Sequence, residues 1–204
     1  MSLCYPADMI SPQIAALLLG YLLGSIPFGL LLTRVSGKGD LRAIGSGNIG
    51  ATNVLRTGSR GLAAFTLFLD AAKGAAAVII AQRYWPEAVN YAAAGALLGH
   101  LYPVWLKFRG GKGVATFLGL LIPLLPLAAA VFAAVWVAVL IALRISSAAG
   151  IAAAASAPVA AAIGGEDRLF PVLLGFAILV IWKHRENIQR LKDGTEPRMG
   201  RSEA

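Results

Sequence analysis

The hydrophobic pattern of this chain consists of long, nearly uninterrupted apolar stretches separated by short polar connections. A helix needs about 20 apolar residues to cross a bilayer. The stretches that approach or exceed this length are 11–34, 61–82, 88–106, 114–144, 147–164 and 168–182. The pattern therefore predicts an all-α integral membrane protein.

The stretch 114–144 is too long to be one membrane helix. At about 1.5 Å per residue it would span about 46 Å, whereas the hydrocarbon core is about 30 Å thick. Pro123 and Pro126 interrupt it, and proline breaks helices because it lacks a backbone N–H donor. We therefore divide it at 122–126, which predicts seven transmembrane helices and places the two termini on opposite sides.

Positive charges are concentrated on one side of these predicted helices. Of the 18 Lys and Arg residues, all but Arg83, Arg168 and Lys73 fall in connections on that side. Those connections are 34–60, 107–113, 144–147 and the tail from 183. Because cytosolic loops of membrane proteins are rich in Lys and Arg, we expect the N-terminus outside and the C-terminus in the cytosol.

Composition supports the membrane interpretation. Apolar residues make up 58% of the chain and charged residues 14%, against roughly 45–50% and about 25% in soluble domains. The net charge of +8 lies in the cytosolic connections, so no nucleic acid partner is expected. Met1–Met9 contains no Lys or Arg, unlike a cleavable signal peptide, so we expect the first span to remain. Residues 1–204 are predicted to form a single membrane domain.

Three polar segments fall on the predicted cytosolic side, at 45–56, 99–113 and 183–190. The first two are rich in glycine and lead into helices, whose N-termini favour anions because their backbone N–H groups are unpaired. Nearby cations would balance the charge of phosphate groups: Arg56, Lys107, Arg109, Lys112, Lys183, Arg185 and Arg190. The sequence therefore predicts a phosphate site at one membrane face.

Other motif interpretations are less favourable. The spacing of Gly45, Gly47 and Gly50 satisfies G-x-G-x-x-G, but a dinucleotide-binding fold requires a strand before it and a βαβ unit around it. The segment Gly110–Gly113 lacks the Ser or Thr that follows the lysine of a Walker A loop. No His/Cys cluster has metal-ligand spacing, so no metal site is expected.

The polar segments, in their order and spacing, resemble those of the bacterial PlsY-type acyl-phosphate:glycerol-3-phosphate acyltransferases, which are small seven-span membrane enzymes. The similarity covers nearly the whole chain. The segments that carry it are Gly24–Pro27, Gly45–Arg56, Asp70–Gly74, Gly99–His100, Gly110–Thr116, Ser146–Ser147 and His184–Leu191. Ile49 stands where some relatives have proline, which affects the stiffness of that loop.

The resemblance implies transfer of a fatty acyl group from acyl phosphate to the 1-hydroxyl of glycerol 3-phosphate. The products would be lysophosphatidic acid (1-acyl-glycerol 3-phosphate) and inorganic phosphate, in the first acylation of phospholipid synthesis. It further implies a multi-pass protein of the bacterial inner membrane with its active site at the cytosolic face. No cofactor, metal or obligatory protein partner is expected, because acyl phosphate is already an activated anhydride; the partners are the two substrates and membrane lipid.

The resemblance also assigns site residues. The catalytic residues would be His184, Asn187, Lys112 and Ser46. Substrate and phosphate groups would be bound by Ser46, Gly47, Asn48, Asn53, Arg56, Lys107, Arg109, Gly110, Gly111, Lys112, Gly113, Ser147, His184, Asn187 and Arg190. His184 would either accept the proton of the acceptor hydroxyl or position the substrate while a phosphate oxygen takes the proton.

Less specific interpretations stay open for several residues. Lys107 and Arg109 also fit ordinary cytosolic loop cations, and Ser147 also fits a helix cap. Asp70 and Lys73 lie three positions apart within a span, where an unpaired charge is costly, so we expect them to pair with each other. Trp136, like the other tryptophans, is interpreted as an anchor or packing residue.

Two other functions compete with the acyltransferase. A small membrane protein with charges inside its spans also fits a transporter or channel for an organic anion. A noncatalytic lipid-binding scaffold is the third class. The transporter is disfavoured because the polar groups gather at one face instead of lining a route across the bilayer.

Overall fold

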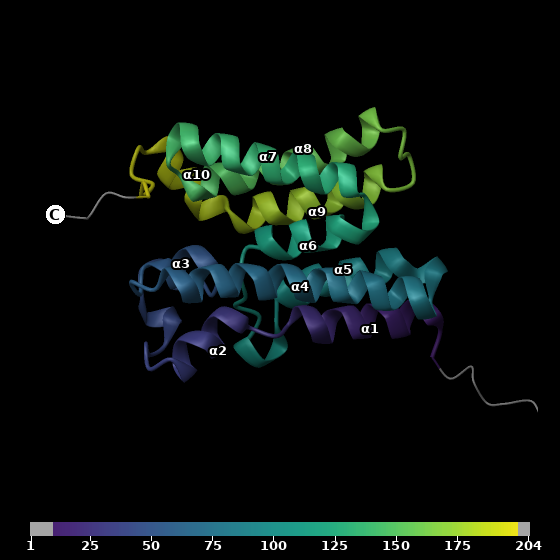
Figure 1. Cartoon of the computed structure of the whole chain (residues 1–204), viewed down its shortest axis with the longest axis horizontal. Helices are drawn as coiled ribbons and strands as arrows, with labels where there is room; N and C mark the ends of the chain where they lie inside the picture. Colours follow the sequence, from purple (N-terminus) through teal and green to yellow (C-terminus); the bar gives the residue numbers. More distant parts are fainter. Residues whose placement is uncertain (1–9, 200–204) are drawn as a thin grey trace, which may run out of the picture.

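The computed structural model describes residues 10–199, and within that range the chain forms helices and no strands (Figure 1). The α-helices are α1 (Pro12–Gly24), α2 (Phe28–Val35), α3 (Ala51–Leu55), α4 (Arg60–Tyr84), α5 (Val89–Leu101), α6 (Val114–Leu124), α7 (Pro126–Leu143), α8 (Ser146–Ile163), α9 (Phe170–Lys183) and α10 (Arg185–Lys192). Short 3-10 helices are η1 (Leu41–Ala43), η2 (Pro86–Ala88) and η3 (Val104–Leu106). The predicted all-α class is confirmed. The expectation about a signal peptide concerns Met1–Met9, outside the described residues.

Four helical segments are long and apolar enough to cross a membrane: Pro12–Val35, which contains α1 and α2, and the helices α4, α7 and α8. The helices in the other predicted spans are shorter, with 13 residues in α5, 11 in α6 and 14 in α9. At about 1.5 Å per residue, each of these three is shorter than a hydrocarbon core of about 30 Å.

Prolines set the breaks between several helices. Leu125 separates α6 from α7, and Pro126 is the first residue of α7, which confirms the division at 122–126 and is a favourable place for proline. In contrast, the predicted span 88–106 ends as a helix at Leu101. Pro103 disfavours helical backbone at Tyr102, whose φ of −139° and ψ of 57° are not helical.

Small residues bring the helices close together. A Cβ added to Gly24 on α1 would collide with the carbonyl oxygen of Ala96 on α5, and one on Gly119 of α6 would collide with that of Ala71 on α4. Glycine at such crossings lets backbones approach, which is how helices associate in lipid. The α1/α5 and α4/α6 pairs are therefore held by close backbone contact.

The bundle has two groups of helices with α6 between them: α1 to α5 on one side, and α7 to α10 on the other (Figure 1). Phe117 of α6 packs edge-on against Phe132 of α7 at 5.5 Å and Phe176 of α9 at 5.8 Å between ring centroids. The short helices α3 and α10, which are far apart in sequence, lie at the same end of the bundle (Figure 1). That end holds the first and third polar segments, and the second connects α5 to α6 closer to the middle of the bundle (Figure 1).

Candidate active site

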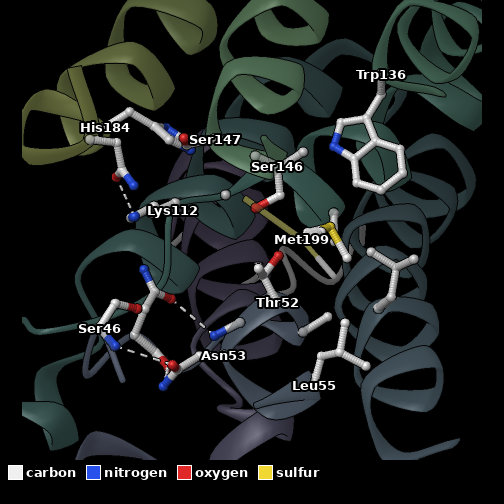
Figure 2. Close-up of a pocket in the computed structure, with 18 of the residues that line it drawn as sticks. Ser46, Thr52, Asn53, Leu55, Lys112, Trp136, Ser146, Ser147, His184 and Met199 are labelled. Carbon is white, nitrogen blue, oxygen red and sulfur yellow. Dashed lines mark hydrogen bonds between the residues drawn. The ribbon is translucent and has the colours of Figure 1, made fainter. Parts of the chain in front are cut away.

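A cavity of about 1010 Å³ opens between the two helix groups at this end. Residues from all three polar segments line it, together with α4, α7 and the segment after α10. In Figure 2, Lys112, His184 and Ser46 lie toward one side, whereas Trp136, Leu55 and Met199 lie toward the other. The helix packing thus joins three segments of different sequence position around one space.

The cavity has a polar wall and an apolar wall. Its polar wall is formed by Ser46, Asn48, Asn53, Arg56, Lys112, Ser147, His184, Asn187 and Arg190. The apolar wall is formed by Leu55, Leu67, Leu118, Phe132, Ala133, Trp136 and Val137. Trp136, expected as an anchor or packing residue, lines the cavity because this part of α7 faces it. A molecule with an anionic head and a hydrocarbon tail matches both walls.

Most of the predicted site residues meet at this cavity, but five do not line it. The exceptions are Gly47, Lys107, Arg109, Gly110 and Gly111. The side chains of Lys107 and Arg109 are exposed. Gly47, Gly110 and Gly111 are close in sequence to the cavity residues Ser46 and Lys112, but they do not themselves line the cavity.

The backbone of the second glycine segment departs from the expected phosphate cradle. The N–H of Gly110 donates to the carbonyl of Leu101 at 3.2 Å, and that of Gly111 donates to the carbonyl of His100 at 3.0 Å. These two amides are therefore engaged with the end of α5 and are not free for an anion. Gly113, with a φ of +87° that favours glycine, caps the N-terminus of α6 and lines the cavity.

His184 sits between α9 and α10 and is only 2% exposed. Its Nδ1 is 2.7 Å from the carbonyl oxygen of Val180; because a carbonyl only accepts, Nδ1 carries the proton and Nε2 is left as an acceptor. Burial lowers the pKa of His184 from 6.5 to about 4, with a smaller lowering from the positive charge of Lys112. The imidazole is therefore neutral at physiological pH.

Lys112 provides a cation inside the cavity. Its Nζ donates to Oδ1 of Asn187, which joins the second polar segment to the third. Burial lowers the pKa of Lys112 from 10.5 to about 8, against the opposing effect of the nearby Glu196 carboxylate. Lys112 therefore remains mostly protonated at neutral pH and can neutralise an anion without first taking up a proton.

Glu196 is a cavity residue that the sequence analysis missed. Its Oε1 accepts hydrogen bonds from Ser147 Oγ and Asn187 Nδ2, each at 2.6 Å, and its Oε2 accepts one from Arg190 Nε at 2.7 Å. The side chain is 7% exposed. It follows α10 in a short tail with no hydrophobic periodicity, so only the order Gly194-Thr-Glu-Pro197, which marks a turn, hinted at a fixed conformation.

Replacing Glu196 with glutamine is expected to lower the Tm in detergent at neutral pH. Burial raises the pKa of Glu196, but the hydrogen bonds from Ser147, Asn187 and Arg190 outweigh it, so the pKa lies below its usual 4.5. A carboxyl with a lowered folded-state pKa stabilises the fold above the unfolded pKa, and this stability is lost as the pH falls through the folded value.

The gap in Tm between wild type and Glu196→Gln should therefore close as the pH is lowered below about 4.5. Glu186→Gln is a matched control, because that side chain is 75% exposed and lies 3.7 Å from Arg185. It should leave the Tm unchanged, as exposed ion pairs contribute little. A Glu196→Gln gap that is constant with pH would contradict the assigned contacts.

Asn53 is buried and its amide is used within its own loop. Oδ1 accepts from the Ser46 N–H at 3.3 Å, while Nδ2 shares its two hydrogens among the carbonyls of Leu41, Ile44 and Asn48 at 2.8 to 3.0 Å. Its side chain holds the loop that presents Ser46, and Asn53 also lines the cavity. The expected contact of Asn53 with substrate stays a prediction.

Asn53→Ala should accordingly destabilise the protein by about 1–3 kcal/mol, since it leaves buried loop carbonyls unsatisfied. The Tm in detergent measures this loss of stability. Amide hydrogen exchange at Ser46 measures the loosening of the loop, and it should become faster in the variant. Unchanged exchange at Ser46 would show that Asn53 does not hold the loop.

Within residues 10–199, no three His, Cys, Asp or Glu side chains gather in a way that would hold a metal ion.

Asp70 lines the cavity, but its Oδ1 is 2.6 Å from Nζ of Lys73. This confirms the expected pairing of the two charges inside α4.

The fold and cavity define a class: helical integral membrane proteins with a site shaped for an amphiphilic anion. A family model described as glycerol-3-phosphate acyltransferase matches residues 14–194, and the chain belongs to that family, as a PlsY-type enzyme. Among curated relatives, the glycerol-3-phosphate acyltransferases of Rhodopseudomonas palustris (strain BisB5) and Mesorhizobium japonicum are 54% and 56% identical. They cover 94% and 92% of this chain, and the alignments span 98% and 96% of the relatives.

The fold is also similar to solved structures. A crystal structure of PlsY (YgiH), an integral membrane glycerol 3-phosphate acyltransferase, in its glycerol 3-phosphate form, has a TM-score of 0.88 and 36% identity, covering 93% of this chain and 96% of the other. Its lysophosphatidic acid form has a TM-score of 0.86 and 34% identity, with the same coverage. The helix arrangement is thus that of an integral membrane acyltransferase.

Proposed function

We propose that this enzyme transfers a fatty acyl group from acyl phosphate to the 1-hydroxyl of glycerol 3-phosphate, giving lysophosphatidic acid and inorganic phosphate. The observation that carries the proposal is the cavity with one apolar wall and one polar wall that bears Arg56, Lys112 and Arg190. Both substrates bear phosphate, and only the donor bears a long hydrocarbon chain. The apolar wall along α7 would hold that chain, and the polar wall would hold both phosphates beside each other.

The proposed reaction needs no group beyond the two substrates. The 1-hydroxyl oxygen attacks the acyl carbonyl carbon, the bond from that carbon to the bridging phosphate oxygen breaks, and the hydroxyl proton ends on the departing phosphate. Acyl phosphate is an activated mixed anhydride, so no cofactor or metal is required. The protein's contribution is to align the two substrates and to neutralise the charge that develops on the phosphate.

Lys112 is assigned the largest electrostatic role, because it is a partly buried cation whose ammonium lies inside the cavity. Arg56 and Arg190 would hold the remaining phosphate charge, together with the hydroxyls of Ser46 and Ser147. Gly113, at the start of α6, brings a helix N-terminus toward the same anions.

The remaining predicted contacts act from outside the cavity wall. Lys107 and Arg109 would attract anionic substrates from the surface of the loop. Gly47, Gly110 and Gly111 would shape the two loops that carry Ser46 and Lys112. Asn48 lines the cavity and has its Oδ1 engaged by the Gly50 N–H at 2.9 Å, so its amide hydrogens would meet the substrate.

For the proton, the lowered pKa of His184 favours the substrate phosphate as acceptor. The monoester phosphate of glycerol 3-phosphate has a second pKa of about 6, well above the pKa of about 4 of His184. This phosphate oxygen is therefore the stronger base and can pass the proton on to the departing phosphate. The single hydroxyl hydrogen would lie between the phosphate oxygen, which takes the proton, and Nε2 of His184, which orients the hydroxyl by accepting a weaker, shared hydrogen bond. Asn187, three residues further on, would orient Lys112 through its Oδ1.

The proposal includes a topology. Seven membrane segments, with the N-terminus outside and the C-terminus in the cytosol, would place the cavity at the cytosolic face of the bacterial inner membrane. The cations around α2, α3 and α10, which lie at the cavity end, support this orientation. A soluble acceptor made in the cytosol would then reach the cavity directly.

The test uses purified protein in sealed liposomes with palmitoyl phosphate. Release of inorganic phosphate that depends on added glycerol 3-phosphate, with equal formation of lysophosphatidic acid, is expected. Palmitoyl-CoA should give no product, because it carries no transferable acyl phosphate. Uptake of glycerol 3-phosphate into the liposomes without turnover would instead support a transporter, and binding without turnover or uptake would support a scaffold.

A further inference from the structure

A cluster of charged and polar side chains is buried beside the cavity, where α1, α4 and α5 meet. Asp70, Lys73 and His100 are 3 to 4% exposed. Nζ of Lys73 is 2.6 Å from Oδ1 of Asp70 and also donates to the carbonyl of Ile26 at 2.8 Å. That carbonyl lies at the break between α1 and α2, where it also accepts the N–H of Phe28 at 3.1 Å. The ion pair is thus fixed to the backbone of the connection between α1 and α2.

His100 extends the cluster toward the second glycine segment. Its Nδ1 is 3.7 Å from Oδ1 of Asp70, and among the described residues this Nδ1 has no hydrogen-bond partner. This separation is somewhat longer than a hydrogen bond, so a small movement of the ring would form one. The charged pair on α4 therefore favours one orientation of the imidazole, with Nδ1 toward the carboxylate.

The other side of His100 contacts the loop. Its carbonyl accepts the Gly111 N–H at 3.0 Å, and its ring fills the space beside Gly111, where an added Cβ would collide with Nε2. The next residue is Lys112, whose ammonium reaches into the cavity. A continuous series of contacts thus runs from the α1–α2 break to the residue before Lys112.

We propose that His100 is a positioning residue that sets the place of Lys112 in the cavity, and that Asp70 and Lys73 fix the orientation of the His100 ring. The inference rests on the proposed role of Lys112 in holding phosphate. A displacement of about 1 Å at a reacting group is enough to slow a reaction by about a hundredfold. A ring packed directly on the preceding residue is well placed to prevent it.

The test compares His100→Asn with His100→Leu in the full-length protein. The asparagine amide keeps a polar atom near the place of Nδ1, whereas leucine keeps comparable bulk without polarity. We expect His100→Leu to lower kcat/KM for glycerol 3-phosphate by about tenfold or more, the equivalent of about 1.4 kcal/mol. His100→Asn should retain more activity, even where its Tm is no higher than that of His100→Leu. Activity that follows Tm in the two variants would mean that His100 only fills space.

A second measurement asks whether His100 acts through Lys112. In a Lys112→Ala background, His100→Leu should cause no further loss of turnover, because residues acting in one series are not additive. Additive losses would overturn the inference. Where His100→Leu does not fold, Gly111→Ala presses on the same ring from the loop side and should show the same dependence on Lys112.

The pH profile gives a third readout. The groups that act on the pKa of Lys112 are the carboxylates of Glu196 and Glu186 and the guanidinium groups of Arg190 and Arg56, besides burial. Moving Lys112 outward reduces its burial and so raises its pKa. The alkaline limb of kcat/KM should therefore shift to higher pH in His100→Leu and stay at its wild-type pH in His100→Asn. An unchanged limb in both variants would contradict the inference. Wild-type protein without acyl-phosphate turnover would instead overturn the proposed function itself.

Discussion

Lys112→Ala is expected to lower kcat/KM for phosphate release by about 100- to 1000-fold, the range found when one electrostatic contact to a developing charge is removed. The reason is that Lys112 is protonated within a partly desolvated cavity, where a charge acts more strongly than in water. Steady-state kinetics with palmitoyl phosphate and glycerol 3-phosphate measure the effect. The Tm should change little, because the only hydrogen bond of the ammonium within the described residues is to Asn187.

Arg109→Ala is the matched control for this variant. Arg109 is a cation of the same loop, but it is exposed and does not line the cavity. Its removal should change kcat/KM by less than about threefold at physiological salt, because an exposed charge is screened. If Arg109→Ala and Lys112→Ala were equally impaired, the reaction would not take place in this cavity.

His184→Ala is expected to lower kcat by about a hundredfold, because a misplaced acceptor hydroxyl reacts more slowly. Since the imidazole has a pKa of about 4, it is neutral throughout the working range. The limb of the pH profile near 6, which we assign to phosphate, should therefore persist in the variant. Measurement of kcat between pH 5 and pH 9 decides this.

His184→Gln separates positioning from proton transfer. The glutamine carbonyl oxygen can accept a hydrogen bond from the 1-hydroxyl but cannot take up its proton. We expect this variant to keep clearly more activity than His184→Ala. If both variants were equally inactive and the limb near pH 6 disappeared, His184 would be the general base.

The helical architecture was predictable because the signals for it are local. A long apolar stretch identifies a membrane helix wherever it occurs, and Pro126 starts a new helix because proline lacks a donor whatever its surroundings. Helix ends were less predictable. The apolar pattern predicted a third span that ends at residue 106, whereas the helix ends at Leu101. The prediction was too long because the residues of the turn at Tyr102–Pro103 and those after it are also mostly apolar.

The candidate site was predictable to the extent that its chemistry lies in recognisable segments. The family resemblance of the glycine-rich and basic segments assigned Ser46, Lys112 and His184 to the site, and all three line one cavity in the structure. Glu196 was not identified, because its importance comes from three hydrogen bonds to side chains distant along the chain. Asn53 was identified, but its contacts with its own loop are visible only in three dimensions.

The sequence by itself determined the class of protein, the number of apolar stretches and the uneven distribution of charge, because hydrophobicity and charge act residue by residue. Only the tertiary structure decided which face of each helix looks into the cavity. Trp136 became part of its wall, Lys107 and Arg109 were left outside, and the amides of Gly110 and Gly111 were taken by the end of α5. Such outcomes depend on how closely helices pack and where a backbone donor finds its acceptor, and both involve residues far apart in the chain.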